Sequence, residues 1–485
     1  MTKELRRLSI LVLLMFLALF GSTSVIQVVQ ADNLAQNPLN RRTLYDSFEV
    51  QRGSIIASGS AIASSVPTND LYSWQRKYTD PAMWAPVTGY LTVLPSSTGI
   101  ERAMNQELSG IGNSQFLARV EQIVSGQPPR GSNVVLSLDT KVQKAAYDAL
   151  GSLQGAVVAI EPKTGRILAM VTSPSFDTNK LASHDTGAVT KEYEKLKDDA
   201  SNPLYNRAIG GNMNPPGSTF KLVVVSAALA SGAFTPDSKL PNLSVYTLPG
   251  TSHRVYNDTR GTCGPGKEVS IADALRLSCN IPMAQLAVKV GSDAIRKEAE
   301  KYGFNSSFTM PLTSAPSVYP LAPNVAQTAL TGFGQGDSLR ATPLQMAMVS
   351  AAIANGGVVL KPRMVDQIVG PDLKVQQRFD TEEYGRALDA GLDKELADMM
   401  VANVSKGIAT NARIDGVDVG GKTGTAQNGP DNPFSLWFTG FAPAEDPQVA
   451  VAVVVENGGG LGQSGTGNSL AAPIAKKVME AVLGK

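Results

Sequence analysis

The chain has very few residues that could serve as soft metal ligands. Only two histidines, His184 and His253, and two cysteines, Cys263 and Cys279, occur among its 485 residues. An ordinary zinc or iron site takes several such ligands, so we expect neither a bound metal nor another cofactor. A Ser-His-Asp mechanism is also disfavoured, because its base would be one of two histidines in polar stretches. We predict that both histidines are ordinary surface residues.

An excess of charge of either sign is also lacking. The 43 lysines and arginines nearly balance the 42 acidic residues. Without a strong field the chain has no general attraction for nucleic acid, so we expect no nucleic-acid partner and binding at a shaped site instead. The length and a hydrophobic content of 43% suffice for two or more folded parts.

Charged residues are missing from one long segment near the N-terminus. Three basic residues precede an uncharged run from Leu8 to Ala31. Such a run can span a bilayer, and the basic residues are expected to stay on the cytoplasmic side. We therefore predict a cytoplasmic segment 1–7, a single anchor 8–30 in the plasma membrane, and an extracytoplasmic remainder. A signal peptide cleaved at Val29-Gln30-Ala31 is the alternative, and it would export the remainder equally.

Two folded parts are expected after the anchor. Residues 31–132 are polar and irregular, which indicates a small N-terminal pedestal or dimerisation-like domain, with a mere spacer as the alternative. Residues 133–485 alternate between strand and helix patterns, which predicts one mixed α/β (α+β) domain. The expected elements are a strand starting within 51–56, a helix at 100–108, strands at 134–138, 156–160, 167–171, 436–441 and 449–455, and helices at 141–150, 222–230 and 471–483.

Ser218 and Lys221 form the first candidate catalytic pair. They lie in Pro215-Pro216-Gly217-Ser218-Thr219-Phe220-Lys221, directly before an apolar helix pattern. Residues three apart share one face of a helix, so the lysine amine can lie beside the serine hydroxyl. A partly desolvated lysine loses its proton near neutral pH and can act as the base that activates a serine. A helix cap beside a solvated lysine is the alternative, although no other Ser-x-x-Lys occurs in the chain.

The second candidate is Ser278-Cys279-Asn280, between helices expected to begin near Ile271 and Pro282. A hydroxyl there can relay a proton between the base and a leaving group, and the Asn280 amide can hold a substrate backbone amide. The alternative is a turn between two helices with Asn280 as the N-cap of the second.

The third candidate is Lys-Thr-Gly, which occurs twice. Lys163-Thr164-Gly165 lies between two strands of an expected hairpin, where a turn with glycine is all that the geometry requires. Lys422-Thr423-Gly424 follows a strand-like segment and leads into Thr425. We expect Lys422 and Thr423 to bind a carboxylate, Gly424 to let a substrate backbone approach, and the Thr425 and Ser218 N–H groups to form an oxyanion hole.

Together these motifs resemble the penicillin-binding proteins, whose active sites carry Ser-x-x-Lys, Ser-x-Asn and Lys-Thr-Gly in this order. Further matching segments extend the resemblance from about residue 133 to the C-terminus. These are Asn206-Arg207-Ala208, Gly334-Gln335-Gly336, Thr342 to Ala347 and Ala354-Asn355-Gly356-Gly357. Because no stretch as large as a glycosyltransferase precedes residue 133, the chain looks like the monofunctional class B type with a short N-terminal domain.

The resemblance implies a D,D-transpeptidase that cross-links the stem peptides of peptidoglycan. Ser218 would form the acyl-enzyme, Lys221 would be its base, Ser278 would relay the proton and Asn280 would orient the substrate. The second Lys-Thr-Gly would recognise the terminal carboxylate, and β-lactams would acylate the serine as substrate mimics. The implied fold is the penicillin-binding transpeptidase and serine β-lactamase fold, with a five-stranded antiparallel sheet flanked by helices. Division or elongation proteins would be its protein partners.

The cysteine inside Ser278-Cys279-Asn280 departs from the family pattern, where this position is variable. Because export favours oxidation, we hypothesise a disulfide between Cys263 and Cys279 that braces Ser278 and Asn280 and contributes about 3 kcal/mol. Two buried free thiols are the alternative.

Four other functions could retain the same motifs. A D,D-carboxypeptidase or a serine β-lactamase would pass the acyl group to water, but no dedicated carboxylate base for that water is identifiable in the sequence. A non-catalytic β-lactam sensor or a division scaffold could also keep the pocket, although a sensor would need a signalling module.

Overall fold

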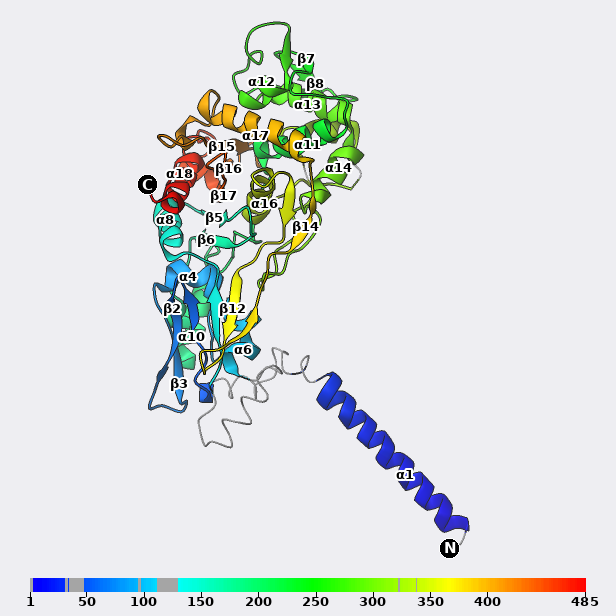
Figure 1. The fold of residues 1–485 in the computed structure, drawn as a ribbon, viewed down its shortest axis with the longest axis vertical. Helices are drawn as coiled ribbons and strands as arrows, with labels where there is room; N and C mark the ends of the chain where they lie inside the picture. Colours follow the sequence, from blue (N-terminus) through cyan, green and yellow to red (C-terminus); the bar gives the residue numbers. More distant parts are fainter. Residues whose placement is uncertain are drawn as a thin grey trace.

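The N-terminal segment is a long apolar helix. The computed structural model describes residues 3–30, 34, 48–94, 97–110, 130–321, 323–336 and 338–485. Helix α1 (Lys3–Ser24) continues into a π-helical turn, η1 (Val25–Val29) (Figure 1). The most apolar 18-residue window within these 27 residues has a mean hydropathy of 2.3, which makes the helix a candidate membrane span. Ala31, at the alternative cleavage site, lies outside the described residues.

A five-stranded antiparallel sheet forms the centre of the C-terminal part (Figure 1). Its strand order is β15-β16-β17-β5-β6, so β15 lies at an edge. The fold expected from the resemblance is therefore confirmed. The strands are β5 (Gly155–Ile160), β6 (Ile167–Ser173), β15 (Gly420–Ala426), β16 (Ser435–Ala442) and β17 (Val449–Val455).

Both faces of this sheet are covered, because successive strand residues point to opposite sides. In β17, the alternate valines from Val449 to Val455 pack in one core with α8 (Thr140–Leu150) and α18 (Ala471–Leu483). Ala450, Ala452 and Val454 belong to the other core, which contains α11 (Lys221–Ala230) and α16 (Pro343–Ile353). Burial on both faces explains why β17 is apolar throughout.

The remaining elements of this part do not belong to the five-stranded sheet. They are η3 (Gly217–Phe220), β7 (Lys239–Pro241), β8 (Tyr246–Thr247), β9 (Arg254–Val255), β10 (Glu268–Ser270), α12 (Ile271–Arg276), α13 (Asn280–Val290), α14 (Ser292–Lys301), α15 (Val325–Thr331), β11 (Val358–Leu360), β14 (Glu383–Arg386), α17 (Ala390–Ser405), η4 (Thr410–Ala412) and η5 (Asn457–Gly460).

A six-stranded sheet, which we call the pedestal sheet, forms the other folded part. Its order is β13-β12-β4-β1-β2-β3, with β4 parallel to β1 and antiparallel to β12. Its strands and helices are β1 (Ile55–Ala57), β2 (Ser60–Pro67), β3 (Trp74–Tyr78), α4 (Pro81–Thr88), α5 (Gly99–Ala103), α6 (Asn105–Ser109), β4 (Asn133–Leu136), β12 (Val365–Val369) and β13 (Val375–Arg378). The helix expected at 100–108 is two short helices, because Met104 leaves the helical conformation.

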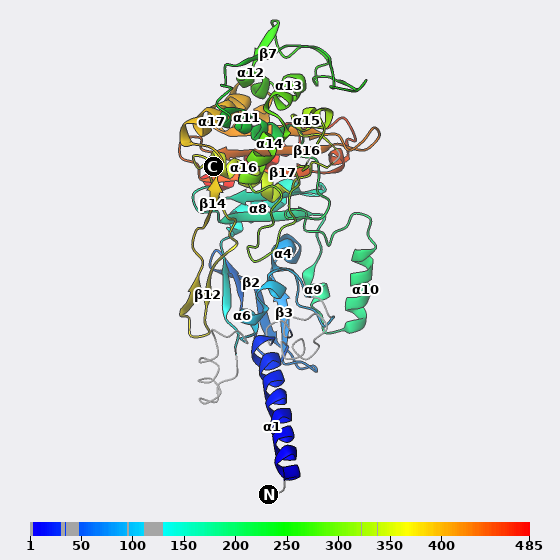
Figure 2. The ribbon, with the colours of Figure 1, turned by 90° about the vertical axis from the view of Figure 1, so that its right-hand side faces the viewer.

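The two parts are interleaved in the sequence. The strand expected at 134–138 as the start of the second domain is β4, which pairs within the pedestal sheet, as do β12 and β13 from far along the chain. Helices α9 (Thr178–Leu181) and α10 (Thr186–Lys197) lie alongside the pedestal sheet (Figure 2), and Asn179 hydrogen-bonds with both backbone groups of Tyr78. One hydrophobic cluster extends through both parts, from Ile55 to Val454. The pedestal therefore packs directly against the part that contains the five-stranded sheet.

Candidate active site

Ser218 lies in a short 3-10 turn, η3, that leads directly into helix α11. Gly217 has φ +54, which glycine adopts without the steric cost of a side chain. Its N–H donates to the Gly334 carbonyl at 3.0 Å, and a Cβ on Gly334 would lie only 1.7 Å from the Gly217 carbonyl oxygen. Two backbone segments thus touch beside Ser218. They hold the serine in a position that is 7% exposed.

Lys221 is fully buried one helical turn from Ser218. Its Nζ donates to the Ser278 carbonyl oxygen at 2.6 Å and to Asn280 Oδ1 at 2.9 Å. Burial lowers the pKa of Lys221 to about 7, while the Asp258 carboxylate raises it in part. The amine is thus available in its neutral form near pH 7 and can accept a proton. The Ser218 hydroxyl forms no hydrogen bond with any described residue.

The Ser278 hydroxyl is the point where two lysines meet. Its Oγ accepts a hydrogen bond from Lys422 Nζ at 2.6 Å and lies 3.3 Å from Lys221 Nζ. Ser278 has φ +55, an uncommon conformation for a residue with a side chain, and such strain is often found at functional sites. This backbone conformation belongs to the turn between α12 and α13. The expected convergence of the three motifs is present in the structure.

Asn280 is the first residue of α13 rather than its N-cap, which is Cys279. Its side-chain oxygen faces Lys221, and its Nδ2 donates to Asp258 Oδ1 at 3.0 Å. The Asn257 side chain caps the helix instead, because its Oδ1 accepts from the N–H groups of Asn280 and Ile281 at 2.9 and 3.0 Å. The Asn280 amide is therefore held beside the base, where a substrate would compete for it.

Lys422 lies on the edge strand β15 and is fully buried. Besides Ser278, its Nζ donates to the Thr423 carbonyl at 2.9 Å. Burial lowers the pKa of Lys422 well below its usual value, and the neighbouring Lys221 lowers it further. This amine is therefore easily deprotonated. A carboxylate bound beside it would raise the pKa again, because an opposite charge favours the ammonium form.

Gly424 lies against the segment that carries Ser218. A Cβ at this position would lie 2.9 Å from the Pro216 carbonyl oxygen and 3.1 Å from both Thr219 Cγ2 and Trp437 Cβ. The absence of a side chain therefore lets the η3 segment pack closely on β15. The approach of a substrate backbone to Gly424 stays a prediction.

Thr425 lies next to the nucleophile segment, as an oxyanion hole would require. A Cβ on Gly217 would lie 3.1 Å from the Thr425 carbonyl carbon and oxygen, so η3 and β15 are in contact there. The Thr425 hydroxyl accepts a hydrogen bond from the Gly467 N–H at 3.4 Å. Trp437 Nε1 also donates to the Pro215 carbonyl at 2.9 Å, which ties the sheet to the segment before Ser218.

Cys263 and Cys279 are joined in a disulfide, with Cα atoms 5.8 Å apart. Cys279 separates Ser278 from Asn280 in the sequence, so the bond attaches the strained turn to the loop that precedes β10. Both cysteines are buried. The structure thus contains the brace that the sequence hypothesis names.

The first Lys-Thr-Gly has a different environment from the second. Lys163 is 59% exposed at the turn between β5 and β6 and pairs with the exposed Asp446. Gly165 has φ +70, and a Cβ there would lie 2.5 Å from the Lys361 carbonyl oxygen. This copy shapes a turn, as expected.

The sequence motifs did not identify Asn257 and Asp258. Both hydrogen-bond with Asn280, and Asp258 raises the pKa of Lys221. Both lie in the loop that follows β9, and no periodic pattern marks them.

The prediction that His184 is an ordinary surface residue was wrong. Its side chain is 8% exposed, pairs with Asp70 at 2.7 Å and contacts the rings of Phe48 and Tyr72. Within the described residues no group of three His, Cys, Asp or Glu side chains could hold a metal.

Two family models match the chain. The penicillin binding protein transpeptidase domain matches residues 155–480, and the penicillin binding protein A dimerisation domain matches residues 52–134. The first match covers more than half of the chain. The chain therefore belongs to the penicillin-binding protein transpeptidases, and the resemblance seen in its motifs is confirmed.

Within this family the chain is similar to the actinobacterial penicillin-binding protein A. The peptidoglycan D,D-transpeptidase PbpA of Mycolicibacterium smegmatis is 39% identical over 492 residues, covering 100% of this chain and 99% of the relative. The ceftriaxone acyl-enzyme complex of penicillin-binding protein A from Mycobacterium tuberculosis matches with a TM-score of 0.87 at 39% identity, covering 90% of this chain and 100% of that one. The penicillin G acyl-enzyme complex of the same protein matches with a TM-score of 0.85.

Proposed function

We propose that this chain is a serine-type peptidoglycan D,D-transpeptidase that cross-links stem peptides and is acylated by β-lactams. The observation that carries this function is the Ser278 hydroxyl, which lies within 3.3 Å of two buried lysine amines beside Ser218. One lysine can accept a proton near neutral pH, and the second can provide a cation once an anion binds. Membership of the transpeptidase family supports the same reaction.

Acylation begins when the neutral Lys221 amine takes the proton of the Ser218 hydroxyl. The serine oxygen then attacks the carbonyl carbon before a terminal D-alanine. As the C–N bond breaks, the proton reaches the leaving amine through Ser278, whose hydroxyl lies 3.3 Å from Lys221 Nζ. The Lys221 amine must turn towards Ser218 for this step, and catalytic hydrogen bonds often tighten only in the substrate complex.

The acyl group then passes to an acceptor. The amine of a neighbouring stem peptide attacks the ester carbonyl and gives up a proton to the neutral Lys221 amine. The C–O bond to Ser218 then breaks, and Lys221 returns this proton to the serine oxygen. Asn280 would orient the donor peptide, and Lys422 with Thr423 would bind its terminal carboxylate. The N–H groups of Ser218 and Thr425 would stabilise the oxyanion, and Gly424 would keep η3 close enough for both to reach it.

The same proposal extends to topology and organisation. Residues 1–7 would lie in the cytoplasm, 8–30 would form a single-pass anchor in the plasma membrane, and 31–132 and 133–485 would be the pedestal and transpeptidase domains outside the cytoplasm. The apolar helix and the two family matches support this division, although the pedestal sheet also takes strands from the second domain. Division or elongation proteins would be the partners that position it.

Labelling with a fluorescent penicillin tests the catalytic assignment. Ser218→Ala and Lys221→Ala should lose the label, because they remove the nucleophile and its base. Lys163→Ala, in the exposed first Lys-Thr-Gly, should keep it. Equal labelling of Ser218→Ala and the unaltered protein would refute the proposal.

The fate of the label separates the related functions. A transpeptidase should hold the bound β-lactam for a long time, whereas a β-lactamase should release it quickly by hydrolysis. Formation of cross-linked dimers from purified stem-peptide substrates distinguishes it further from a carboxypeptidase and from a non-catalytic scaffold.

A further inference from the structure

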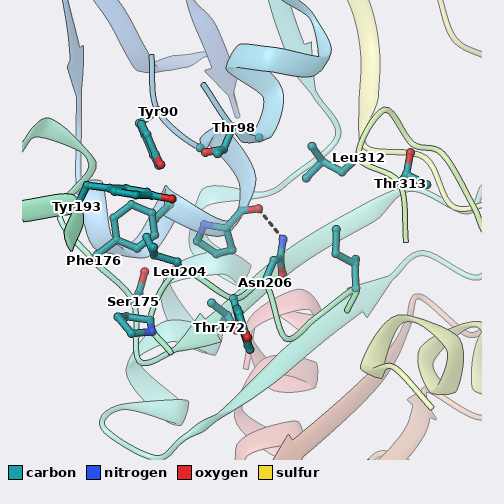
Figure 3. Close-up of a pocket in the computed structure, with 17 residues that line it drawn as sticks. Tyr90, Thr98, Thr172, Ser175, Phe176, Tyr193, Leu204, Asn206, Leu312 and Thr313 are labelled. Atoms are coloured by element: carbon teal, nitrogen blue, oxygen red, sulfur yellow. Dashed lines mark hydrogen bonds between the residues drawn. The ribbon is translucent and has the colours of Figure 1, made fainter. Parts of the chain in front are cut away.

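A cavity of about 360 Å³ lies where the pedestal meets the transpeptidase part (Figure 3). The pedestal contributes α4 and the segments around Tyr90 and Thr98, and the transpeptidase part contributes the end of β6, α10 and the segment 203–209. None of the proposed site residues lines it. Its size is at the lower end of the range typical for small-molecule sites.

The lining is aromatic and carries no charge. Four aromatic side chains contribute, and the other lining residues are aliphatic, hydroxyl-bearing, amide, proline or glycine residues. Tyr90 and Phe176 meet edge to face, with ring centroids 5.8 Å apart. Stem peptides and β-lactams carry carboxylates, and this cavity offers no cation to bind one. A ligand that fits here is therefore neutral.

Two phenol groups, those of Tyr90 and Tyr193, line the cavity. Tyr90 is 4% exposed and Tyr193 is half-buried, and neither hydroxyl hydrogen-bonds with any described residue. Figure 3 shows both hydroxyl ends directed towards the same region of the cavity, one from the pedestal and one from α10. Burial, and to a smaller extent Tyr193, raises the pKa of Tyr90 to about 12, so this phenol stays neutral. Both hydroxyls are therefore free to hydrogen-bond with a ligand that enters the cavity.

We propose that this cavity binds one neutral N-acetylated sugar ring of the peptidoglycan glycan strand. The assignment rests on the proposed function, because it places the sugar portion of the same substrate at a second site. A pyranose ring has an apolar C–H face that packs on aromatic rings, and its hydroxyl and acetamide groups can hydrogen-bond with the two phenols. A single ring fits the volume, and the absence of charge matches a neutral sugar.

Saturation-transfer NMR with N-acetylglucosamine as the probe tests this site. The unaltered full-length protein in detergent should show saturation transfer to the sugar. Tyr193→Ala should raise the dissociation constant about tenfold, because it removes a ring face and a hydroxyl. Tyr90→Phe keeps the ring and should produce a smaller rise. Tyr246→Ala, which alters a tyrosine outside the cavity, should leave binding unchanged.

Two further measurements separate this site from the catalytic one. Protein acylated by penicillin G should bind the sugar as well as free protein does, and Tyr193→Ala should still take the fluorescent label, which shows that it is folded. Absence of saturation transfer with a protein that labels normally would overturn this inference alone. Loss of sugar binding on acylation, or unchanged binding in Tyr193→Ala, would overturn it too. Failure of the unaltered protein to label would instead refute the proposed function.

Discussion

Each part of the molecule buries a pair of basic side chains, and the two pairs have different partners. In the pedestal, Arg52 and Arg76 share one carboxylate, Glu101, and all three side chains are at most 1% exposed. In the transpeptidase part, Lys221 and Lys422 share a hydroxyl, that of Ser278. The nearest acidic influence on them is Asp258, which lies at an exposed position.

The difference follows from what each cation can do when it loses contact with water. An arginine keeps its proton in proteins, so the pedestal pair needs a buried anion. Burial alone would raise the pKa of Glu101, but the two guanidinium groups lower it below its usual value. A lysine can release its proton instead, so the lysine pair tolerates burial with neutral partners and becomes a source of bases. The buried ion pairs therefore stabilise the pedestal, whereas the buried lysine amines of the transpeptidase part can lose a proton and act as bases.

The largest expected effect comes from replacing Lys221 by arginine, the basic residue that the pedestal buries. In Lys221→Arg the guanidinium cannot give up its proton at neutral pH, so acylation by penicillin should slow by about 10³-fold. The rate constant of acylation, measured with a fluorescent penicillin, checks this. Lys221→Met, which also lacks a base but has a similar length, should be equally slow. A Lys221→Arg variant that acylates at the normal rate would show that this position does not supply the base.

Removing the shared anion of the pedestal should affect stability instead of chemistry. Glu101→Leu leaves two arginines buried without a counter-charge, so the free energy of unfolding should fall by about 3–5 kcal/mol. Urea unfolding followed by circular dichroism measures this. Asp446→Ala removes the partner of the exposed Lys163 and is the matched control, with little expected change. A Glu101→Leu variant as stable as this control would mean that the pedestal arginines are not truly desolvated.

The disulfide should rank next. A disulfide fixes the turn at Ser278, whereas ion pairs with Glu101 connect segments of the pedestal. Replacing both Cys263 and Cys279 by serine should lower the free energy of unfolding by about 3 kcal/mol, because the unfolded chain regains the freedom that the cross-link removed. Intact mass after thiol alkylation without reductant provides a direct check, and two alkylated thiols in the exported protein would contradict the bond.

The smallest effect is the pH dependence of acylation. Since the pKa of Lys221 is lowered to about 7, its neutral fraction rises about tenfold between pH 6 and pH 8, and the acylation rate should rise with it. Asp258 raises this pKa, so Asp258→Asn should move the midpoint to lower pH. Lys163→Ala should leave the profile unchanged. A flat profile across this range would exclude titration of Lys221 from the rate-limiting step.

Most of the fold was predictable where local pattern and final environment agree. The strands that became β5, β6, β16 and β17, and helices α8, α11 and α18, appear within a few residues of their expected bounds. The pedestal was less predictable. Its sheet depends on pairing between residues 55–57, 133–136 and 365–369, and no local pattern reports a partner that lies hundreds of residues away.

The candidate site divides in the same way. The motifs identified Ser218, Lys221, Ser278 and Lys422 as candidate site residues, because the order and spacing of the motifs can be read directly from the sequence. They did not indicate Asn257 and Asp258, whose contacts with Asn280 form only in the folded chain, or the close packing of the η3 segment on Gly424.

By itself the sequence determined which chemical groups are available, because an amine, a hydroxyl and a short motif are properties of the residues. It also determined the apolar N-terminal helix and the alternation that places two cores on one sheet. Only the tertiary structure decided the protonation of those amines, the strained turn at Ser278 and the neutral cavity at Tyr90. Each of these depends on loss of water around a group, and segments distant in the sequence remove that water.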